Sequence, residues 1–320
     1  MAAAVSSLAP PRPAPPSLLD DLAAIFARGS TYVRRDPALW PLLRRQAELM
    51  RLPCVRAEDA ELVCDLGLAN GMAITLLDDV IDVAGDLARY DALADRYDAA
   101  LFGPAGAAPV ATADPIAIAL DGLAAVLRAH LEALPRYAEL ADLLRFDLAQ
   151  SLAAMRYDAL FRRYRLHSAV EYVDTFHDHS MTVLWIKTLE LCASPGFARA
   201  DLSALRDAAR LAQRAISFSG DAASWPTEVA AGERHPGVIT HAIARGLLSW
   251  ADLDACDGEP VAVTAAIHDS GVVAAIERDI AACLAALPAA CARVASVDLS
   301  GWTAQVRALI AAQQAIRGRL

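Results

Sequence analysis

Residues 71–82 of the chain read Gly-Met-Ala-Ile-Thr-Leu-Leu-Asp-Asp-Val-Ile-Asp, an uncharged run that ends in three aspartates. On a helix, Asp78 and Asp82 lie one turn apart on the same face, and Asp79 is close to both. Carboxylates held this close repel each other, and a divalent cation removes that repulsion. Mg²⁺ prefers oxygen ligands and shares its coordination shell with substrate phosphates. The stretch therefore predicts a helix that carries a magnesium and diphosphate site facing an apolar cavity. A solvated acidic helix face is the alternative, and the uncharged run before Asp78 argues against it.

The composition favours a helical protein with a large core. Hydrophobic residues make up 56% of the 320 residues, and alanine, the best helix former, is abundant. Nearly every segment after residue 16 shows helical periodicity, and none shows strand alternation. We therefore expect an all-α protein with one domain over residues 17–320. Residues 1–16 are rich in Ala, Pro and Ser, which predicts a disordered N-terminus.

The periodicity also predicts where the helices lie. The expected helices span residues 17–29, 37–50, 57–84, 86–102, 114–131, 134–164, 168–193, 200–224, 235–249, 259–287 and 298–317.

Charge and cysteine usage exclude several classes of partner and location. A formal net charge of −10 argues against nucleic acid, whose phosphates recruit basic surfaces. The six cysteines show no metal-binding spacing, which is typical of buried thiols in a reducing compartment. The N-terminus lacks the basic start of a signal peptide. No uncharged apolar stretch reaches the roughly 18 residues that a membrane span requires. We expect a cytoplasmic protein without a membrane span.

A second set of ligand-type side chains lies in the last third of the chain. Residues 220–228 read Gly-Asp-Ala-Ala-Ser-Trp-Pro-Thr-Glu. On a helix, Gly220, Ser224 and Glu228 share one face because they are four residues apart. A hydroxyl and a carboxylate at this spacing can chelate one Mg²⁺. Taken alone the signal is weak, since Ser/Glu pairs are also common capping features.

Together the two segments resemble the signature of class I terpene synthases, an aspartate-rich DDxxD helix and a downstream (N/D)DxxSxxxE motif. The resemblance covers roughly residues 17–320, and regions 168–193 and 213–239 look most similar to bacterial kaurene-synthase-like diterpene cyclases. It implies a helical bundle surrounding a deep apolar cavity. It also implies a lyase that ionises a prenyl diphosphate, with a diterpene-sized substrate favoured, cyclises the carbocation and releases diphosphate.

The resemblance also implies a set of metal ligands and a catalytic motif formed by Asp78, Asp79 and Asp82. The family binds three Mg²⁺ ions. Asp78 and Asp82 would hold two of them. Ser224 and Glu228, with Asp221 or a water molecule, would hold the third.

The second motif departs from the family pattern at its first ligand. Gly220 stands where the family has Asn or Asp, and it has no side chain that can coordinate. On a regular helix Asp221 points about 100° away from the Gly220 position. We therefore expect Asp221 to replace it only if the helix is distorted. Pro226 supplies a reason for a distortion, because proline removes a backbone donor and clashes with the preceding turn.

The groups that would contact the substrate follow from the same resemblance. The predicted diphosphate-binding residues are Arg234, His235 and Arg317, with Lys187, His177 and His179 as further candidates. Aromatic faces stabilise carbocations without reacting with them, and small residues leave space for the substrate. The predicted cavity-lining residues are Gly71, Thr75, Tyr172, Phe176, Trp185 and Phe218, although aromatic residues such as these are more often ordinary core than cavity lining.

Two other functions remain open from the sequence. A chain-elongating prenyltransferase would carry two aspartate-rich motifs and several lysines, whereas the second motif here ends in Glu and Lys187 is the single lysine. A non-catalytic helical binding protein with a degenerate site is the other, and Gly220 and Pro226 favour it. The expected partners are a prenyl diphosphate and, as is common in the family, a second copy of the chain in a homodimer.

Overall fold

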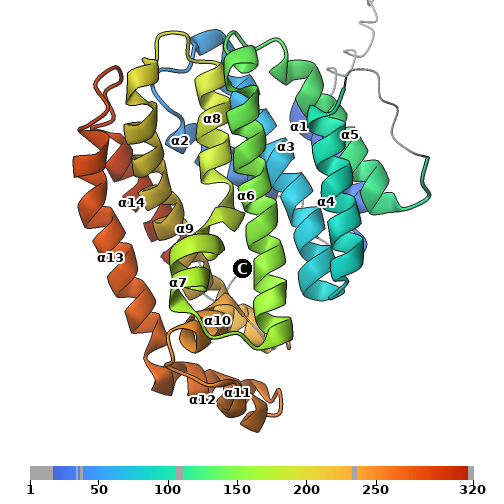
Figure 1. Ribbon diagram of the computed structural model, residues 1–320, viewed down its shortest axis with the longest axis vertical. Helices are drawn as coiled ribbons and strands as arrows, with labels where there is room; N and C mark the ends of the chain where they lie inside the picture. Colours follow the sequence, from blue (N-terminus) through green and yellow to red (C-terminus); the bar gives the residue numbers. More distant parts are fainter. Residues whose placement is uncertain (1–16, 34, 37–38, 105–110, 233–235, 316–320) are drawn as a thin grey trace, which may run out of the picture.

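The computed structural model describes residues 17–33, 35–36, 39–104, 111–232 and 236–315. All regular secondary structure in these ranges is helical and no strand is present in them, which confirms the all-α prediction. The long helices lie alongside one another, with α13 at one edge of the view and α4 and α5 at the other (Figure 1). The predicted disordered segment 1–16 lies outside the described residues.

The elements have the following bounds. In chain order they are α1 (Leu18–Gly29), α2 (Leu39–Met50), η1 (Ala57–Asp59), α3 (Ala60–Asp78), η2 (Asp79–Val83), α4 (Leu87–Phe102), α5 (Pro115–Leu131), α6 (Tyr137–Tyr164), α7 (Ala169–Glu171), η3 (Tyr172–Phe176), η4 (His177–Met181), α8 (Val183–Cys192), η5 (Arg199–Asp201), α9 (Leu202–Ala230), α10 (Gly237–Ala244), α11 (Trp250–Ala255), α12 (Pro260–Ser270), α13 (Val272–Cys291) and α14 (Trp302–Ala315).

Helix α3 is a central helix of the bundle. It contacts α1, α2, α5 and α8, and most of its side chains are buried. A helix that is apolar on nearly every side belongs inside a protein. The stretch Ala57–Val83 is long and apolar enough to cross a membrane, but 61% of its most apolar window is buried within the bundle. Its composition is therefore that of a core helix.

The aspartate-rich motif lies at a change of helix type. After Asp78 the α-helix widens into one π-helical turn, η2, and the chain then turns at Gly85 with a φ of +66°. π-helical turns within α-helices occur frequently at functional sites. The predicted helix over 57–84 is thus nearly correct in its bounds, and its last turn has an altered geometry that periodicity does not report.

The prediction of one continuous helix over 168–193 is wrong. This region is divided into α7, the π-helical turn η3, the 3₁₀ turn η4 and α8. Thr182 separates η4 from α8 with a φ of +54°, a left-handed conformation that is uncommon for a β-branched residue. No glycine or proline marks this break in the sequence, so the apolar period runs through it.

Two C-terminal predictions also need correction. The expected helix over 259–287 is two helices, α12 and α13, because Gly271 ends α12 in the left-handed conformation with a φ of +67°. The short helix α11 falls in a stretch where no separate helix was expected. Its start is a capping box in which Ser249 and Asp252 bond each other's backbone N–H groups.

Helix α9 extends further than expected. It was predicted to end at residue 224, and it continues through Pro226 to Ala230. Proline removes one backbone hydrogen bond from a helix interior, yet α9 stays helical from Pro226 to Ala230. The second motif therefore lies on a continuous helix.

Candidate active site

One cleft of about 200 Å³ brings the two sequence motifs together. It lies where the end of α3, η2, α6, the η3–η4 segment, α9 and the start of α10 meet. The first motif contributes Asp78 and Asp82, and the second contributes Asp221 and Glu228. The remaining lining residues are Ile81, Ala154, Met155, Asp158, Arg162, Tyr172, His177, Ser180 and Gly237.

The carboxylates of the first motif are destabilised in their charged form. Burial, followed by the charges of Asp82 and Asp79, raises the pKa of Asp78 well above its ordinary value. Burial also raises the pKa of Asp82, although the neighbouring Arg162 cation opposes the shift. Asp82 is nevertheless accessible, with 32% of its side chain exposed, whereas Asp78 is half-buried. Closely spaced carboxylates favour either a proton or a cation between them. A positive charge near Asp78 and Asp82 would lower the repulsion between them.

Asp79 does not line the cleft. Its side chain is 4% exposed, and its Oδ1 atom lies 2.7 Å from Nη2 of Arg35. Burial raises the pKa of Asp79, and the Arg35 cation counters part of that shift. The structure therefore separates the three aspartates, with Asp78 and Asp82 at the cleft and Asp79 in an ion pair with Arg35.

Arg162 and Asp158 belong to the site and were not predicted. They lie one turn apart on α6, with Arg162 Nη1 2.8 Å from Asp158 Oδ2, and Arg162 also pairs with Asp82. Arg162 is the one arginine among the described residues that line the cleft. Asp/Arg pairs at this spacing are ordinary surface features of helices, so the sequence alone did not single this pair out.

The second motif presents Asp221 and Glu228 to the cleft, two turns apart on α9. Ser224 is half-buried on the same side of the helix, between these two residues, and does not line the cleft. We expected Asp221 to reach the site only through a distorted helix. It lines the cleft from a helix that continues through Pro226, and its role as the replacement ligand stays a prediction. A β-carbon added at Gly220 would meet no atom within 4 Å, so the first ligand position of the motif is open space.

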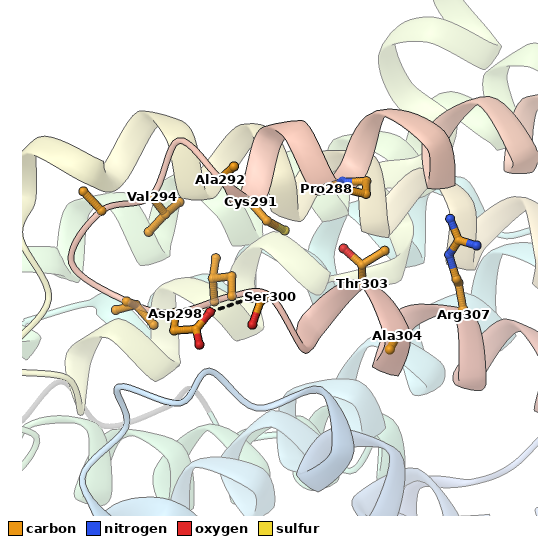
Figure 2. Close-up of a pocket in the computed structure, with 12 residues that line it drawn as sticks. Pro288, Cys291, Ala292, Val294, Asp298, Ser300, Thr303, Ala304 and Arg307 are labelled. Carbon is orange, nitrogen blue, oxygen red and sulfur yellow. Dashed lines mark hydrogen bonds between the residues drawn. The ribbon is translucent and has the colours of Figure 1, made fainter.

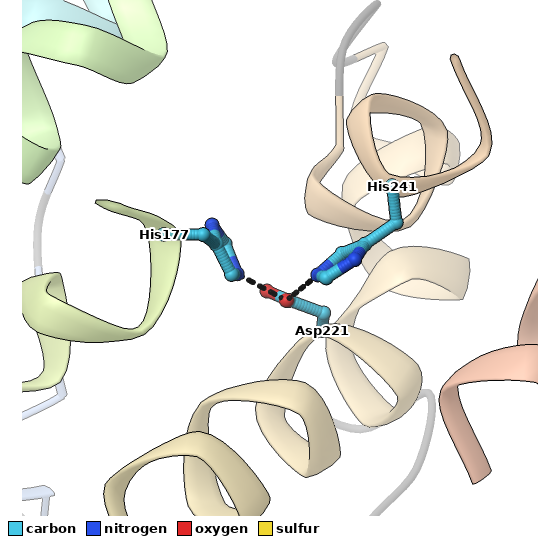
Figure 3. Close-up of side chains that lie close together, drawn as sticks. All are labelled: His177, Asp221 and His241. Atoms are coloured by element: carbon cyan, nitrogen blue, oxygen red, sulfur yellow. Dashed lines mark hydrogen bonds and ion pairs between the residues drawn. The ribbon is translucent and has the colours of Figure 1, made fainter. Parts of the chain in front are cut away.

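A His–Asp–His triad borders the cleft, and two of its members, His177 and Asp221, line it. His177 from η4, Asp221 from α9 and His241 from α10 converge on one point (Figure 3). Nε2 of His177 lies 2.6 Å from Oδ2 of Asp221, and Nε2 of His241 lies 3.1 Å from the same oxygen. His241 is fully buried. The sequence did not point to His241, because nothing in its periodicity relates α10 to the second motif.

Burial and the contacts within the triad shift the pKa values of all three side chains from their ordinary values. Burial alone would raise the pKa of the Asp221 carboxyl, but the two imidazoles hold it well below its ordinary range. Burial opposes the charged form of His177, yet the Asp221 carboxylate outweighs it and raises the pKa of His177. For His241 burial prevails over the bond to Asp221 and lowers its pKa to about 4. At neutral pH the triad therefore contains an ionised Asp221 and a neutral His241.

Gly237 at the start of α10 makes room for the Asp221 carboxylate. A β-carbon on Gly237 would lie 2.6 Å from Asp221 Oδ1 and 2.9 Å from its Cγ. Real side chains do not approach so closely, so any larger residue at this position would displace the carboxylate. Glycine is thus required here by a close approach between side chain and backbone.

The predicted aromatic lining is divided between the cleft and the core. Tyr172 lines the cleft. Phe176 stacks on Tyr157, with ring centroids 4.4 Å apart. Trp185 and Phe218 are fully buried and do not line the cleft, and Phe218 contacts the ring of His241.

The predicted small residues of α3 do not line the cleft, and their role in a cavity stays a prediction. Gly71 and Thr75 are half-buried on a helix that is otherwise mostly buried, on the same side as Asp78. A β-carbon added at Gly71 would meet no atom within 4 Å. The Thr75 hydroxyl donates to the Gly71 carbonyl at 2.9 Å, so its polar group is satisfied within the helix.

Three predicted diphosphate-binding residues cannot be placed. Arg234, His235 and Arg317 lie outside the described residues. Of the further candidates, His177 lines the cleft, whereas Lys187 is buried in an ion pair with Glu190 at 2.7 Å. His179 is 5% exposed and does not line the cleft.

A larger hollow of about 670 Å³ lies between the end of α13 and the start of α14 (Figure 2). Its charged groups are already engaged: Asp298 accepts a hydrogen bond from the Ser300 backbone at 2.9 Å, and Arg307 donates to the Leu284 carbonyl at 3.2 Å. Burial raises the pKa of the Cys291 thiol there, which disfavours a nucleophilic thiolate. The residues of the two motifs line the smaller cleft and not this hollow.

Comparisons with known proteins add no family assignment. No protein-family model matches the chain, and no curated protein shows a significant sequence match.

Proposed function

We propose that the protein is a class I terpene synthase that ionises a prenyl diphosphate. The observation that carries the proposal is the meeting of the two motifs in one cleft. Asp78 and Asp82 line one side, and Asp221 and Glu228 line the other. A diphosphate bound through several cations needs carboxylates on both sides, which one acidic helix alone does not supply.

The donor set of the first motif suits Mg²⁺. All ligand atoms that Asp78 and Asp82 offer are hard carboxylate oxygens. The neighbouring Asp158 adds a buried Oδ1 that has no hydrogen-bond partner. A cation supplied to this side would relieve the repulsion that raises the pKa values of Asp78 and Asp82. Mg²⁺ bound here would neutralise the negative charge that builds up on the departing diphosphate.

Arg162 is the protein's own cation in the described part of the cleft. Its guanidinium pairs with Asp82 and Asp158 and is 17% exposed. Arginine is well suited to phosphate recognition because its planar group offers several donors in a fixed geometry. We assign Arg162 to orienting the diphosphate, and the predicted roles of Arg234, His235 and Arg317 stay predictions.

The hydrocarbon chain would lie along the Asp78 side of α3. A cleft of about 200 Å³ holds a diphosphate but not a diterpene-sized chain as well, since ligand pockets usually measure about 300–1,000 Å³. Gly71 and Thr75 lie further along the same face of α3 and are half-buried, and the space beside Gly71 is open. We propose that the apolar cavity extends there, where water would be excluded from the carbocation.

The two alternative functions make different predictions. A chain-elongating prenyltransferase would join a second prenyl unit, and the cleft would have to bind two diphosphates. Arg162 is the one arginine among the cleft's described lining residues, which favours a single diphosphate. A non-catalytic binding protein would bind the diphosphate without releasing it.

The deciding experiment is incubation of the purified protein with Mg²⁺ and one prenyl diphosphate at a time. Geranyl, farnesyl, geranylgeranyl and bicyclic diterpene diphosphates would be tested, with and without isopentenyl diphosphate. We expect inorganic diphosphate and a cyclic hydrocarbon without isopentenyl diphosphate, and loss of both in Asp78→Asn. Products that appear only with isopentenyl diphosphate would identify a prenyltransferase. Binding without release would identify a non-catalytic protein.

A further inference from the structure

The His177–Asp221–His241 triad has the composition of a transition-metal site. The ligand atoms of the three residues all lie within 4.8 Å of one another. They come from three separate elements, η4, α9 and α10, so the fold and not one local motif brings them together (Figure 3). Two imidazole nitrogens and one carboxylate oxygen are a ligand set that suits Zn²⁺, Co²⁺ or Fe²⁺. Mg²⁺ by contrast prefers oxygen ligands.

We propose that His177, Asp221 and His241 bind one divalent transition-metal ion at the side of the cleft that His177 and Asp221 line. This ion is distinct from the Mg²⁺ assigned to Asp78 and Asp82. Its binding does not depend on the proposed diphosphate chemistry, because all three ligands belong to the protein.

The ligand distances require only a small expansion. A tetrahedral ion with bonds of about 2.1 Å separates its ligand atoms by about 3.4 Å. The two imidazole nitrogens now lie 2.6 and 3.1 Å from Asp221 Oδ2. An increase of less than about 1 Å brings these two distances to the value that an ion requires, and all the ligand atoms already lie within 4.8 Å of one another.

The surroundings hold the ligands in place and leave His241 able to coordinate. The ring of Tyr172 stacks on His177 at 4.9 Å, and Phe218 meets His241 edge to face at 4.7 Å. Nδ1 of His241 is buried without a hydrogen-bond partner. In the metal-free triad the bond to the Asp221 carboxylate holds the proton on Nε2, because a carboxylate can only accept. An ion bound at Nε2 would take the place of that proton, and the ring would then carry its proton on Nδ1. Gly237 keeps the space that the Asp221 carboxylate needs.

The open coordination positions would face the cleft. His177 and Asp221 both line it, whereas His241 approaches from the buried side. Three protein ligands that leave further positions free are the arrangement of reactive rather than structural metal sites. If the proposed function holds, a diphosphate oxygen would occupy one of these positions.

The test uses the full-length protein, freed of metal with a chelator and titrated with Co²⁺ in the absence of substrate. With Mg²⁺ present in excess to occupy the carboxylates of Asp78 and Asp82, we expect one Co²⁺ per chain, and X-ray absorption that shows nitrogen and oxygen neighbours with the multiple-scattering signature of two imidazoles. This spectrum needs no variant, so a misfolded mutant cannot obscure it. A spectrum with sulfur neighbours, which would indicate one of the cysteines, or without imidazole would overturn the proposal.

Matched variants assign the ligands. His177→Gln and His241→Gln keep a polar side chain but remove the imidazole, and each should weaken Co²⁺ binding more than about tenfold. His179→Gln is the control, because His179 is a buried histidine of the same η4 segment that is not part of the triad. Equal weakening in His179→Gln would contradict the assignment. Asp78→Asn should leave Co²⁺ binding unchanged while it abolishes diphosphate release, so the two proposals can fail separately.

Discussion

His177 and Asp221 are joined by a 2.6 Å contact between imidazole Nε2 and carboxylate Oδ2, which links the irregular η4 segment to the middle of α9. The segment before Thr182 is interrupted by π-helical and 3₁₀ turns, and these turns place His177 at the cleft. The interruption that periodicity did not predict is therefore the feature that completes the site.

Replacing Asp78 should separate stability from activity. Asp78→Asn removes a carboxyl whose pKa is raised by burial and by Asp82 and Asp79, so the charged form now opposes folding. We expect a melting temperature equal to or above that of the wild type at neutral pH in a chelator, with no turnover. Because the folded pKa is raised, the wild-type penalty exists above the unfolded pKa and disappears as Asp78 becomes protonated in acid. The difference between the two melting curves should shrink as the pH falls. Asp95→Asn, an exposed carboxyl on α4, is the control and should change neither property.

Removing Arg162 should destabilise the metal-free protein. Arg162→Leu leaves the Asp82 and Asp158 carboxylates without their common cation. Removing one partner of such a partly exposed pair costs about 1–3 kcal/mol of unfolding free energy, between the values for surface and buried pairs. Added Mg²⁺ should restore more stability to this variant than to the wild type, because it can take the place of the guanidinium. Denaturant melts with and without Mg²⁺ measure this difference, and an equal Mg²⁺ effect in both proteins would argue against a cation site at this position.

Two glycines of the site should respond in opposite ways to alanine. Gly237→Ala places a β-carbon 2.6 Å from Asp221 Oδ1 and should weaken Co²⁺ binding and activity by displacing the carboxylate. Gly220→Ala meets no atom within 4 Å, and it replaces a glycine inside α9. It should raise the unfolding free energy by roughly 1 kcal/mol. Titration and thermal melts of both variants check this contrast, and a harmless Gly237→Ala would show that the carboxylate position is not critical.

The open space beside Gly220 has room for the ligand side chain that the second motif lacks. Gly220→Asn adds an oxygen ligand at the position where the family pattern has one, with room for the side chain. We expect the Mg²⁺ concentration for half-maximal diphosphate release to fall. An unchanged requirement would indicate that the position beside Ser224 does not contact a metal, and that Asp221 and Glu228 act from their own positions on the helix.

The sequence anticipated the parts of the fold and site that depend on local pattern. Apolar periodicity placed α1, α4 and α5 within a residue or so of their observed bounds, and carboxylate spacing pointed to Asp78 and Asp82. It did not reveal the break at Thr182, because a left-handed β-branched residue leaves no mark in the hydrophobic period. It also did not reveal His241 or Arg162, since their roles depend on which helices meet and not on any pattern along one helix.

The central claim is that Asp78 and Asp82 on one side of the cleft, and Asp221 and Glu228 on the other, act on the same diphosphate. The most direct test measures Mg²⁺-dependent release of inorganic diphosphate from geranylgeranyl diphosphate by the wild type, Asp78→Asn and Glu228→Gln, with Asp95→Asn as the control. We predict rapid release by the wild type and the control, and a loss of at least about a hundredfold in each of the two site variants. Full activity in either site variant, or no release by the wild type from any prenyl diphosphate, would contradict the account.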